Sequence, residues 1–149
     1  VVGFSVIDRS PNDRKDTGSN IRLSGEFVVN LVDEDHLAQM NVTAAEYGPE
    51  VDEFAMAGLQ SASSISIGAP RIAGSPVSFE CGLHSIVPLG ASRSLILGVV
   101  QVMHIRDEML IDAGQFYVDT QRLRLVARAQ GNFYVRSNDA FELRRVEAG

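Results

Sequence analysis

Two stretches decide the fold, VSFECGLHSIV at Val77–Val87 and SLILGVVQVMHI at Ser94–Ile105. Each is long, apolar and rich in β-branched residues, which is typical of a strand inside a sheet. The segment between them, Pro88–Arg93, contains Pro and Gly and indicates a hairpin turn. Val1–Ile7 and Glu26–Val32 have the same apolar character as the two long stretches. The sequence therefore predicts a sheet of antiparallel strands built around one long hairpin.

Short helical segments are expected between the strands. Gly25 and Gly58 are C-terminal stop signals, and Asp33 has the position of an N-cap. The predicted helices run from Asp16 or Thr17 to Gly25, from Asp33 through Leu37 and Met40, over Val51–Ala57 and over Asp119–Leu125. Gln60–Pro76 reads as a long loop, and Phe141–Arg145 as a final strand. This pattern indicates the α+β class, mainly antiparallel β, built on a small barrel with inserted short helices.

The composition is that of one soluble globular domain over residues 1–149, with 45% hydrophobic and 21% charged residues. A formal net charge of −6 argues against a nucleic-acid partner, because such proteins depend on basic patches. It is compatible with a small phosphorylated ligand. Cys81 is the single cysteine, which excludes an internal disulfide. No apolar run approaches the ~18 residues of a membrane span and no leader pattern is present, so we expect no membrane association and a cytoplasmic location.

Familiar metal and nucleotide motifs are not found in the sequence. His36, His84 and His104 lie far apart, without HxxxH or HExxH spacing, and there is no GxSxG, GxGxxG or GxxxxGK[ST] motif. The run Asp33–His36 has two interpretations, a site for a hard metal ion or an acidic run at the start of a helix. The second is favoured, so no metal site is predicted.

The segment RKDTGS at Arg14–Ser19 places two cations, a hydroxyl and a glycine where a loop becomes a helix. The free N–H groups and partial positive charge of a helix N-terminus suit a phosphate. In the simpler interpretation, Asp16 or Thr17 caps the helix and the two cations are solvated. The spacing alone favours the simpler interpretation.

Two further polar residues lie within the predicted strands. His104 shares a strand face with Val100 and Val102, where a histidine is more often a hydrogen-bonded structural residue than a catalytic one. It also stands near a strand end, where clefts tend to form, so both roles stay open. Glu80 alternates with other polar residues on its strand, which indicates a face that is solvated or that meets another subunit.

A series of short motifs runs through nearly the whole chain. In order they are Lys15–Thr17 with Asn20–Ile21, Ser24–Leu31, Leu37–Ala38 with Met40–Asn41, Asp52–Phe54 with Ala57–Leu59, Pro70–Ile72, Ser75–Pro76, Phe79–Cys81, Leu97–Gly98, His104–Asp107, and Ala127–Arg128 with Gly131 and Tyr134. The ordered series resembles the flavin reductase-like family of FMN-binding split barrels, which includes reductase components of two-component monooxygenases, flavoredoxin-type proteins and ferric reductases. The resemblance implies a split β-barrel and a homodimer, with the flavin near the subunit interface.

The resemblance also implies a set of site residues. Those assigned to the cofactor are Arg14, Lys15, Asp16, Thr17, Ser19, Val29, Asn30, Leu31, Arg128 and Tyr134. Lys15 and Thr17 would hold the FMN phosphate, and Arg14 or Ser19 would assist. His104 is assigned a catalytic role, in which it would orient the nicotinamide or the flavin.

The implied function is that of an NAD(P)H:flavin oxidoreductase, in which a hydride passes from the nicotinamide to flavin N5. The cofactor would be FMN, with FAD as the alternative, and reduced flavin could serve a partner oxygenase. The competing hypothesis is an electron-transfer flavoprotein that retains FMN and has no NAD(P)H reductase activity. One departure from the family pattern is that the chain opens at Val1, without Met and within a strand pattern. We therefore expect the domain to lack the N-terminal segment that family members carry.

Overall fold

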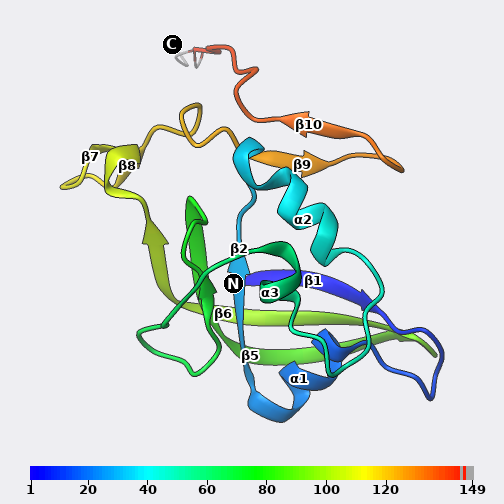
Figure 1. The fold of residues 1–149 in the computed structure, drawn as a ribbon. Coiled ribbons are helices and arrows are strands. Elements are labelled where there is room, and N and C mark those ends of the chain that lie inside the picture. Colours follow the sequence, from blue (N-terminus) through cyan, green and yellow to red (C-terminus); the bar gives the residue numbers. More distant parts are fainter. Residues whose placement is uncertain (145, 147–149) are drawn as a thin grey trace.

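The computed structural model describes residues 1–144 and 146, and its main element is a four-stranded sheet (Figure 1). From one edge to the other, the strands are β1 (Val2–Ile7), β6 (Arg93–Ile105), β5 (Val77–Gly90) and β2 (Glu26–Asn30). Every neighbouring pair is antiparallel. The strands predicted for these segments are confirmed, and β1 and β2 form the two edges.

The β5–β6 hairpin is the centre of the sheet. Its strands reach Gly90 and start again at Arg93, so Ala91 and Ser92 form the turn, which is tighter than the predicted one. The pairing register of β5 and β6 shifts at several points, one of them between Glu80 and Cys81. Such bulges bend a strand and increase its twist, which allows these long strands to curve.

The helices are short and are capped much as the sequence predicts. They are α1 (Asp16–Ser24), the 3-10 turn η1 (Glu34–His36), α2 (Leu37–Thr43) and α3 (Glu53–Ala57). Gly25 ends α1 in the left-handed conformation with φ 71°, which side chains other than glycine rarely adopt. Asp33 caps η1 by accepting a hydrogen bond from the backbone N–H of His36. The predicted helix boundaries at Gly25, Asp33 and Gly58 are confirmed.

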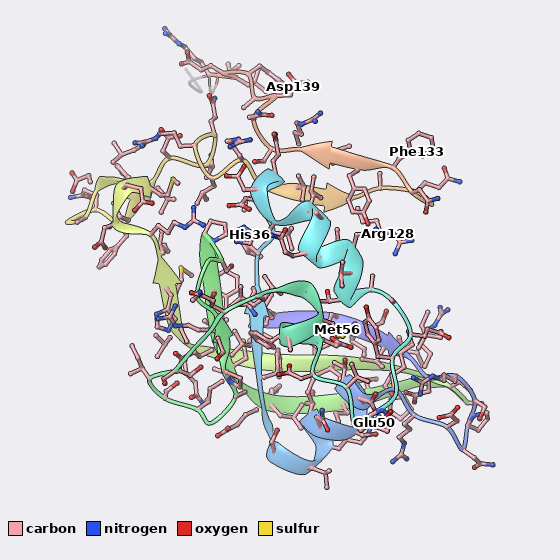
Figure 2. All side chains as sticks on the ribbon, in the orientation of Figure 1. His36, Glu50, Met56, Arg128, Phe133 and Asp139 are labelled. Carbon is pink, nitrogen blue, oxygen red and sulfur yellow. The ribbon has the colours of Figure 1, made fainter. Side chains whose placement is uncertain are left out.

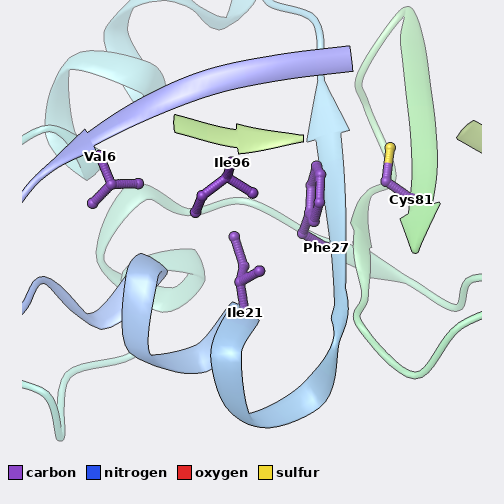
Figure 3. Close-up of a cluster of buried hydrophobic side chains, with 5 residues drawn as sticks. All are labelled: Val6, Ile21, Phe27, Cys81 and Ile96. Carbon is purple, nitrogen blue, oxygen red and sulfur yellow. The ribbon is translucent and has the colours of Figure 1, made fainter. Parts of the chain in front are cut away.

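A small cluster of buried apolar side chains joins α1 to the sheet (Figure 3). It consists of Val6 from β1, Ile21 from α1, Phe27 from β2, Cys81 from β5 and Ile96 from β6. Because α1 contributes Ile21 to this cluster, the start of the helix is held at a fixed position beside the sheet. The Cys81 thiol is free and buried, and burial raises its pKa.

The remaining elements are short strand pairs. β3 (Ser61–Ala62) pairs with β4 (Arg71–Ile72), β7 (Leu110–Asp112) with β8 (Tyr117–Val118) and β9 (Val126–Arg128) with β10 (Tyr134–Arg136), and the 3-10 turn η2 (Asp107–Met109) precedes β7. In Figure 1 the β9–β10 hairpin lies beyond α2, on the side away from the main sheet. The predicted loop Gln60–Pro76 is confirmed as mostly irregular, with β3 and β4 inside it. None of the helices in the described part of the chain has the length and apolar composition of a membrane-crossing helix.

Two predictions for the C-terminal part are wrong. Asp119–Leu125 forms turns rather than a helix, because Arg124 adopts a positive φ of 47° and Leu125 forms a β-bridge with Asp33. Residues 141–144 of the predicted last strand have no regular structure, and their apolar side chains lie in solvent instead of completing a sheet. Arg145 of that prediction lies outside the described residues.

Candidate functional site

A cleft of about 360 Å³ brings together residues from the two ends of the sequence. Lys15, Asp16 and Thr17 reach it from the start of α1, and Arg128 reaches it from the end of β9. We call it the polar cleft. These residues are more than a hundred positions apart in sequence, and the cleft unites four of those assigned to the cofactor. In Figure 2, Arg128 lies beside α2, whose C-terminal Thr43 also lines the cleft.

The first turn of α1 opens into this cleft without a side-chain cap. Lys15 is the N-cap residue, in an extended conformation, and its side chain makes no capping hydrogen bond. Its own backbone N–H donates to Asp8 Oδ1 at 3.2 Å. The interpretation in which Asp16 or Thr17 caps the helix is therefore wrong. Uncapped N–H groups and the helix dipole together favour an anion at this position.

The charges that line the polar cleft are balanced. The cations are on Arg9, Lys15 and Arg128, and the carboxylates are on Asp16, Glu46 and Glu53. An anionic ligand would consequently depend on the local geometry at Lys15, Thr17 and the helix N-terminus, and not on a general positive potential.

Thr17 also lines a second cleft, of about 320 Å³, which lies between the two edge strands of the sheet. Apart from Thr17 and Gly3 its lining is apolar, with Val2 and Phe4 from β1, Ile21 from α1, and Phe27, Val28 and Val29 from β2. We call it the apolar cleft. Val29, which the resemblance assigns to the flavin, lies here. Thr17 therefore lies where a polar and an apolar cleft meet.

Other residues assigned to the cofactor lie elsewhere. Arg14 and Ser19 line a surface hollow formed with the loop before α1, and none of the residues that line this hollow lines the polar cleft. Tyr134 pairs across the β9–β10 ladder with Arg128 and is 40% exposed. Asn30 and Leu31 line a third cavity, described below. The structure thus groups Lys15, Asp16, Thr17 and Arg128 and separates Arg14 and Ser19 from them.

His104 is part of a closed pair with Glu80. His104 Nε2 lies 2.6 Å from Glu80 Oε1, and the Glu80 side chain is fully buried. The same carboxylate accepts hydrogen bonds from the backbone N–H groups of Ile65 and Ser66 and from the Ser66 hydroxyl. Burial raises the pKa of Glu80, but the hydrogen bonds with His104, Ser66 and Ile65 outweigh it and lower the pKa to about 2. His104 is not among the described residues that line the polar cleft or the apolar cleft.

At Glu80 itself the strand face is therefore covered by the chain's own loop, and not by solvent or by another subunit. Ser78 and Glu80 are both buried, and the chain's own loop between β3 and β4 covers the Glu80 carboxylate. Neither alternative derived from the sequence holds at Ser78 and Glu80, whereas His84, farther along the same strand, is exposed as the solvated alternative predicts. The alternation of polar residues is detectable in the sequence. That a loop some fifteen residues away binds the Glu80 carboxylate is not detectable there.

A second histidine–carboxylate pair was not predicted as a site. His36 Nδ1 lies 2.5 Å from Asp33 Oδ1, and Asp33 is 3% exposed. His36 lines a cavity of about 190 Å³ between the end of β2, α2 and β4, which we call the inner cavity. Asn30 and Leu31 line it as well, although Asn30 Oδ1 is occupied by hydrogen bonds from the Ile72 N–H and the Ser78 hydroxyl. In Figure 2, His36 lies where β2 leads into α2.

The acidic run at Asp33–His36 is an anchor for the C-terminal segment. Glu34 pairs with Arg124 at 3.0 Å and with Arg136 at 3.0 Å, and Asp35 pairs with Arg124 at 3.2 Å. The hydrogen bond from Arg124 is the main cause of the lowered pKa of Glu34. These pairs flank β9 and β10, so they hold the hairpin that carries Arg128 against the start of α2. The capping interpretation of this run is confirmed by the Asp33 cap.

Comparison with known proteins identifies the family and the fold. The model of the flavin reductase like domain family matches residues 2–121. A protein of Deinococcus radiodurans of uncharacterized function is 36% identical over 147 residues, which are 98% of this chain and 64% of that protein. The chain therefore spans somewhat less than two thirds of the length of that relative.

Solved structures show the same fold. Nitrilotriacetate monooxygenase component B from Bacillus cereus aligns with a TM-score of 0.88 at 29% identity over 95% of this chain and 70% of its own. The 2-nitrobenzoate 2-nitroreductase NbaA of Pseudomonas fluorescens aligns with a TM-score of 0.85 at 29% identity over 96% and 68%. A protein with a split barrel domain from Shewanella frigidimarina aligns with a TM-score of 0.81 at 20% identity, over 97% of this chain and 70% of its own.

These findings define the class as a mainly antiparallel split barrel with a few short helices, which confirms the predicted fold. The chain belongs to the flavin reductase-like family.

Proposed function

We propose that this protein is an NAD(P)H:flavin oxidoreductase that binds FMN across the polar and apolar clefts. The observation that carries the proposal is the position of Thr17, which lines both clefts beside the uncapped start of α1. FMN has a polar ribityl phosphate and an apolar ring system, and the two clefts offer a matching pair of environments. The donor set fits the group, because Lys15, Thr17 and Arg128 supply the charge and hydrogen bonds that a phosphate requires.

The chain's own residues would act by binding and positioning. Lys15 and the first-turn N–H groups of α1 would hold the phosphate, and Arg128 would close the cleft from β9. Val28 and Val29 would exclude water from the ring through the apolar cleft. When bound, the flavin supplies the chemistry of hydride acceptance, so the protein needs no acid–base pair at that step. Holding two planar rings in contact accounts for much of the rate in such a reaction.

The role that we propose for His104 is to orient the nicotinamide of NAD(P)H or the flavin. Because the Glu80 carboxylate can only accept, His104 Nε2 carries the hydrogen of their 2.6 Å contact, which leaves Nδ1 as the free ring nitrogen. His104→Ala is expected to reduce NAD(P)H oxidation while FMN affinity stays nearly constant. If turnover is unchanged, His104 serves only the fold.

The decisive experiment measures FMN affinity of the double variant Lys15→Ala with Thr17→Ala by fluorescence titration. Charged hydrogen bonds contribute about 1.5–3 kcal/mol each, so we expect the dissociation constant to rise by roughly 100-fold. Arg122→Ala, an exposed arginine outside the cleft, is the matched control. Arg14→Ala tests the assisting role and is expected to have a small effect, because Arg14 lines a different hollow. Unchanged FMN affinity in the double variant would disprove the phosphate site.

Flavin retention separates the proposal from its competitor. A reductase that uses flavin as a substrate releases it, whereas an electron-transfer flavoprotein retains it. Gel filtration of FMN-loaded protein, followed by NADH or NADPH addition with and without free FMN, distinguishes the two. Repeating the titration with FAD determines which flavin is preferred.

We also propose a homodimer. Val99 and Met103 are 45% and 55% exposed on β6, and exposed apolar side chains in a sheet favour association with another surface. Light scattering of the purified protein should give twice the mass of one chain, and a monomer would contradict the proposal. We further propose that reduced flavin passes to a partner oxygenase and that the reaction takes place in the cytoplasm.

A further inference from the structure

Glu80 on β5 and His104 on β6 share one face of the main sheet. In the register of the two strands Ser78 lies opposite His104, so Glu80 is the diagonal neighbour of the histidine. Diagonal neighbours in an antiparallel pair are within reach of long side chains. Glu80 has this reach, because its Oε1 lies 2.6 Å from His104 Nε2. An aspartate at the same position, one methylene shorter, would fall short of the ring.

The Glu80 carboxylate is held in one orientation by groups other than His104. The backbone N–H of Ile65 donates to Oε1 at 2.8 Å. The backbone N–H and the hydroxyl of Ser66 both donate to Oε2, each at 2.7 Å. A carboxylate accepts about four hydrogen bonds, so these three and the contact with His104 fill its sites. The side chain is fully buried, so water does not compete for the same oxygens.

The His104 ring depends on this carboxylate for its orientation. Its contact with Glu80 is the one hydrogen bond of the ring within the described part of the chain. The side chain is 19% exposed, so part of the ring reaches the surface. Because an ionised carboxylate only accepts, the hydrogen of the contact belongs to Nε2, and Nδ1 of the neutral ring is an acceptor. One ring nitrogen is thus fixed, and the other is available to a ligand.

We propose that Glu80 is a positioning residue for the hydride transfer. It fixes the tautomer and the orientation of the His104 ring, so that Nδ1 is the nitrogen that meets the bound nicotinamide or flavin. The inference rests on the proposed function, because it uses the role proposed there for His104. Glu80 itself touches neither the nicotinamide nor the flavin and acts through the histidine. Buried carboxylates orient histidines in the same way in hydrolase triads and in metal sites.

Two conservative variants separate the position of the acceptor from its charge. Glu80→Gln removes the charge, but its side-chain oxygen can still accept from His104 and Ile65 while the amide faces the Ser66 hydroxyl. Glu80→Asp keeps the charge and withdraws the oxygens from the ring. We expect kcat for NAD(P)H oxidation to fall about tenfold in Glu80→Asp and less than about threefold in Glu80→Gln. The reverse order would overturn the proposal, because the charge and not the position would then matter.

A double-mutant cycle tests whether Glu80 acts through His104. Once the histidine is removed, a residue that only positions it has nothing further to lose. The double variant Glu80→Asp with His104→Ala should therefore have a kcat within about twofold of His104→Ala alone. FMN affinity should be the same in all three variants. If Glu80→Asp lowers kcat by its full factor in the absence of His104, the proposal is wrong.

The matched control loosens the same loop without touching the pair. Glu26 accepts the backbone N–H of Gly68 at 2.8 Å and contacts neither Glu80 nor His104. Glu26→Ala should leave kcat unchanged, with circular dichroism showing that each variant is folded. A fall in kcat for Glu26→Ala equal to that for Glu80→Asp would mean that the loop, and not the histidine, matters to the reaction.

The unmodified protein provides a test that needs no variant to fold. In 15N-labelled full chain, the neutral His104 ring should give the NMR signals of a single tautomer with its hydrogen on Nε2. This hydrogen should exchange slowly with water and show a nuclear Overhauser effect to the Ile65 N–H, since both donate to Glu80 Oε1. His84, an exposed histidine on β5, should show averaged tautomers. Averaged signals from His104 as well would refute the positioning role.

The outcomes distinguish this inference from the proposed function. If the unmodified protein does not oxidise NADH or NADPH with added flavin, the proposed function fails and the positioning role fails with it. If the unmodified protein is active and His104→Ala lowers kcat while Glu80→Asp does not, the positioning role alone is wrong. A lowered kcat in both variants without additivity supports both.

Discussion

The two histidine–carboxylate pairs of this protein have the same chemistry and opposite surroundings. Glu80 is fully buried, has all its bonds within the chain and fastens the loop after β3 to the sheet. Asp33 is also buried, but its histidine lines the inner cavity. We therefore expect the first pair to contribute more to stability than the second, whose histidine lines a cavity. A short His–carboxylate distance alone does not identify a functional site.

The largest expected effect is on the closed pair. Glu80→Ala removes a buried carboxylate and leaves the N–H groups of Ile65 and Ser66 without their acceptor. We expect a loss of about 3–5 kcal/mol in the free energy of unfolding, measured by urea denaturation. Glu26→Ala is the control, because Glu26 accepts a single hydrogen bond from the same loop, at Gly68, and should cost about 1 kcal/mol. A loss for Glu80→Ala as small as that of the control would show that the pair does not stabilise the fold.

Local patterns predicted much of the architecture. The alternating and β-branched residues of β5 and β6, and the capping residues Gly25 and Asp33, act through neighbours in the sequence. The bond between Glu80 and His104 joins residues that meet only because of the β5–β6 register and its bulge. No local signal predicts such a register.

The candidate site was only partly accessible from the sequence for the same reason. Lys15 and Thr17 were identifiable because they surround a helix start, but their meeting with Arg128 depends on the ion pairs of Glu34 that hold the C-terminal hairpin. Asp33 was recognised as a cap from its spacing. The contact of the His36 ring with the Asp33 carboxylate is visible only in the structure.

The pair of Asp33 and His36, which we call the open pair, is expected to contribute less to the free energy of unfolding. Asp33→Ala removes an N-cap and the partner of His36, and N-cap losses cost about 0.5–2 kcal/mol. Asp52→Ala is the matched control, because Asp52 caps α3 through the Phe54 N–H but is exposed and has no histidine partner. We expect Asp33→Ala to lie near the upper end of that range and Asp52→Ala near the lower end, by urea denaturation at pH 7. If Asp33→Ala is as damaging as Glu80→Ala, the contrast between a closed and an open pair is not valid.

The smallest effect is expected for the free energy of unfolding at acid pH. There the variant Glu80→Gln removes the charge of Glu80 but keeps the volume of its side chain. The pKa of Glu80 is lowered to about 2 in the folded protein, against 4.5 for an ordinary glutamate. Its contribution to stability is therefore fully present above about pH 4.5 and is lost as the pH falls toward 2. Glu80→Gln has no charge to lose, so its unfolding free energy should decline less between pH 6 and pH 3 than that of the unmodified protein. The other carboxylates contribute equally to the pH dependence of both proteins. The unfolding free energy of the control variant Glu26→Gln should change with pH as that of the unmodified protein does. Parallel curves for Glu80→Gln and the unmodified protein would mean that the buried charge adds nothing to the pair, and that its hydrogen bonds alone hold the loop.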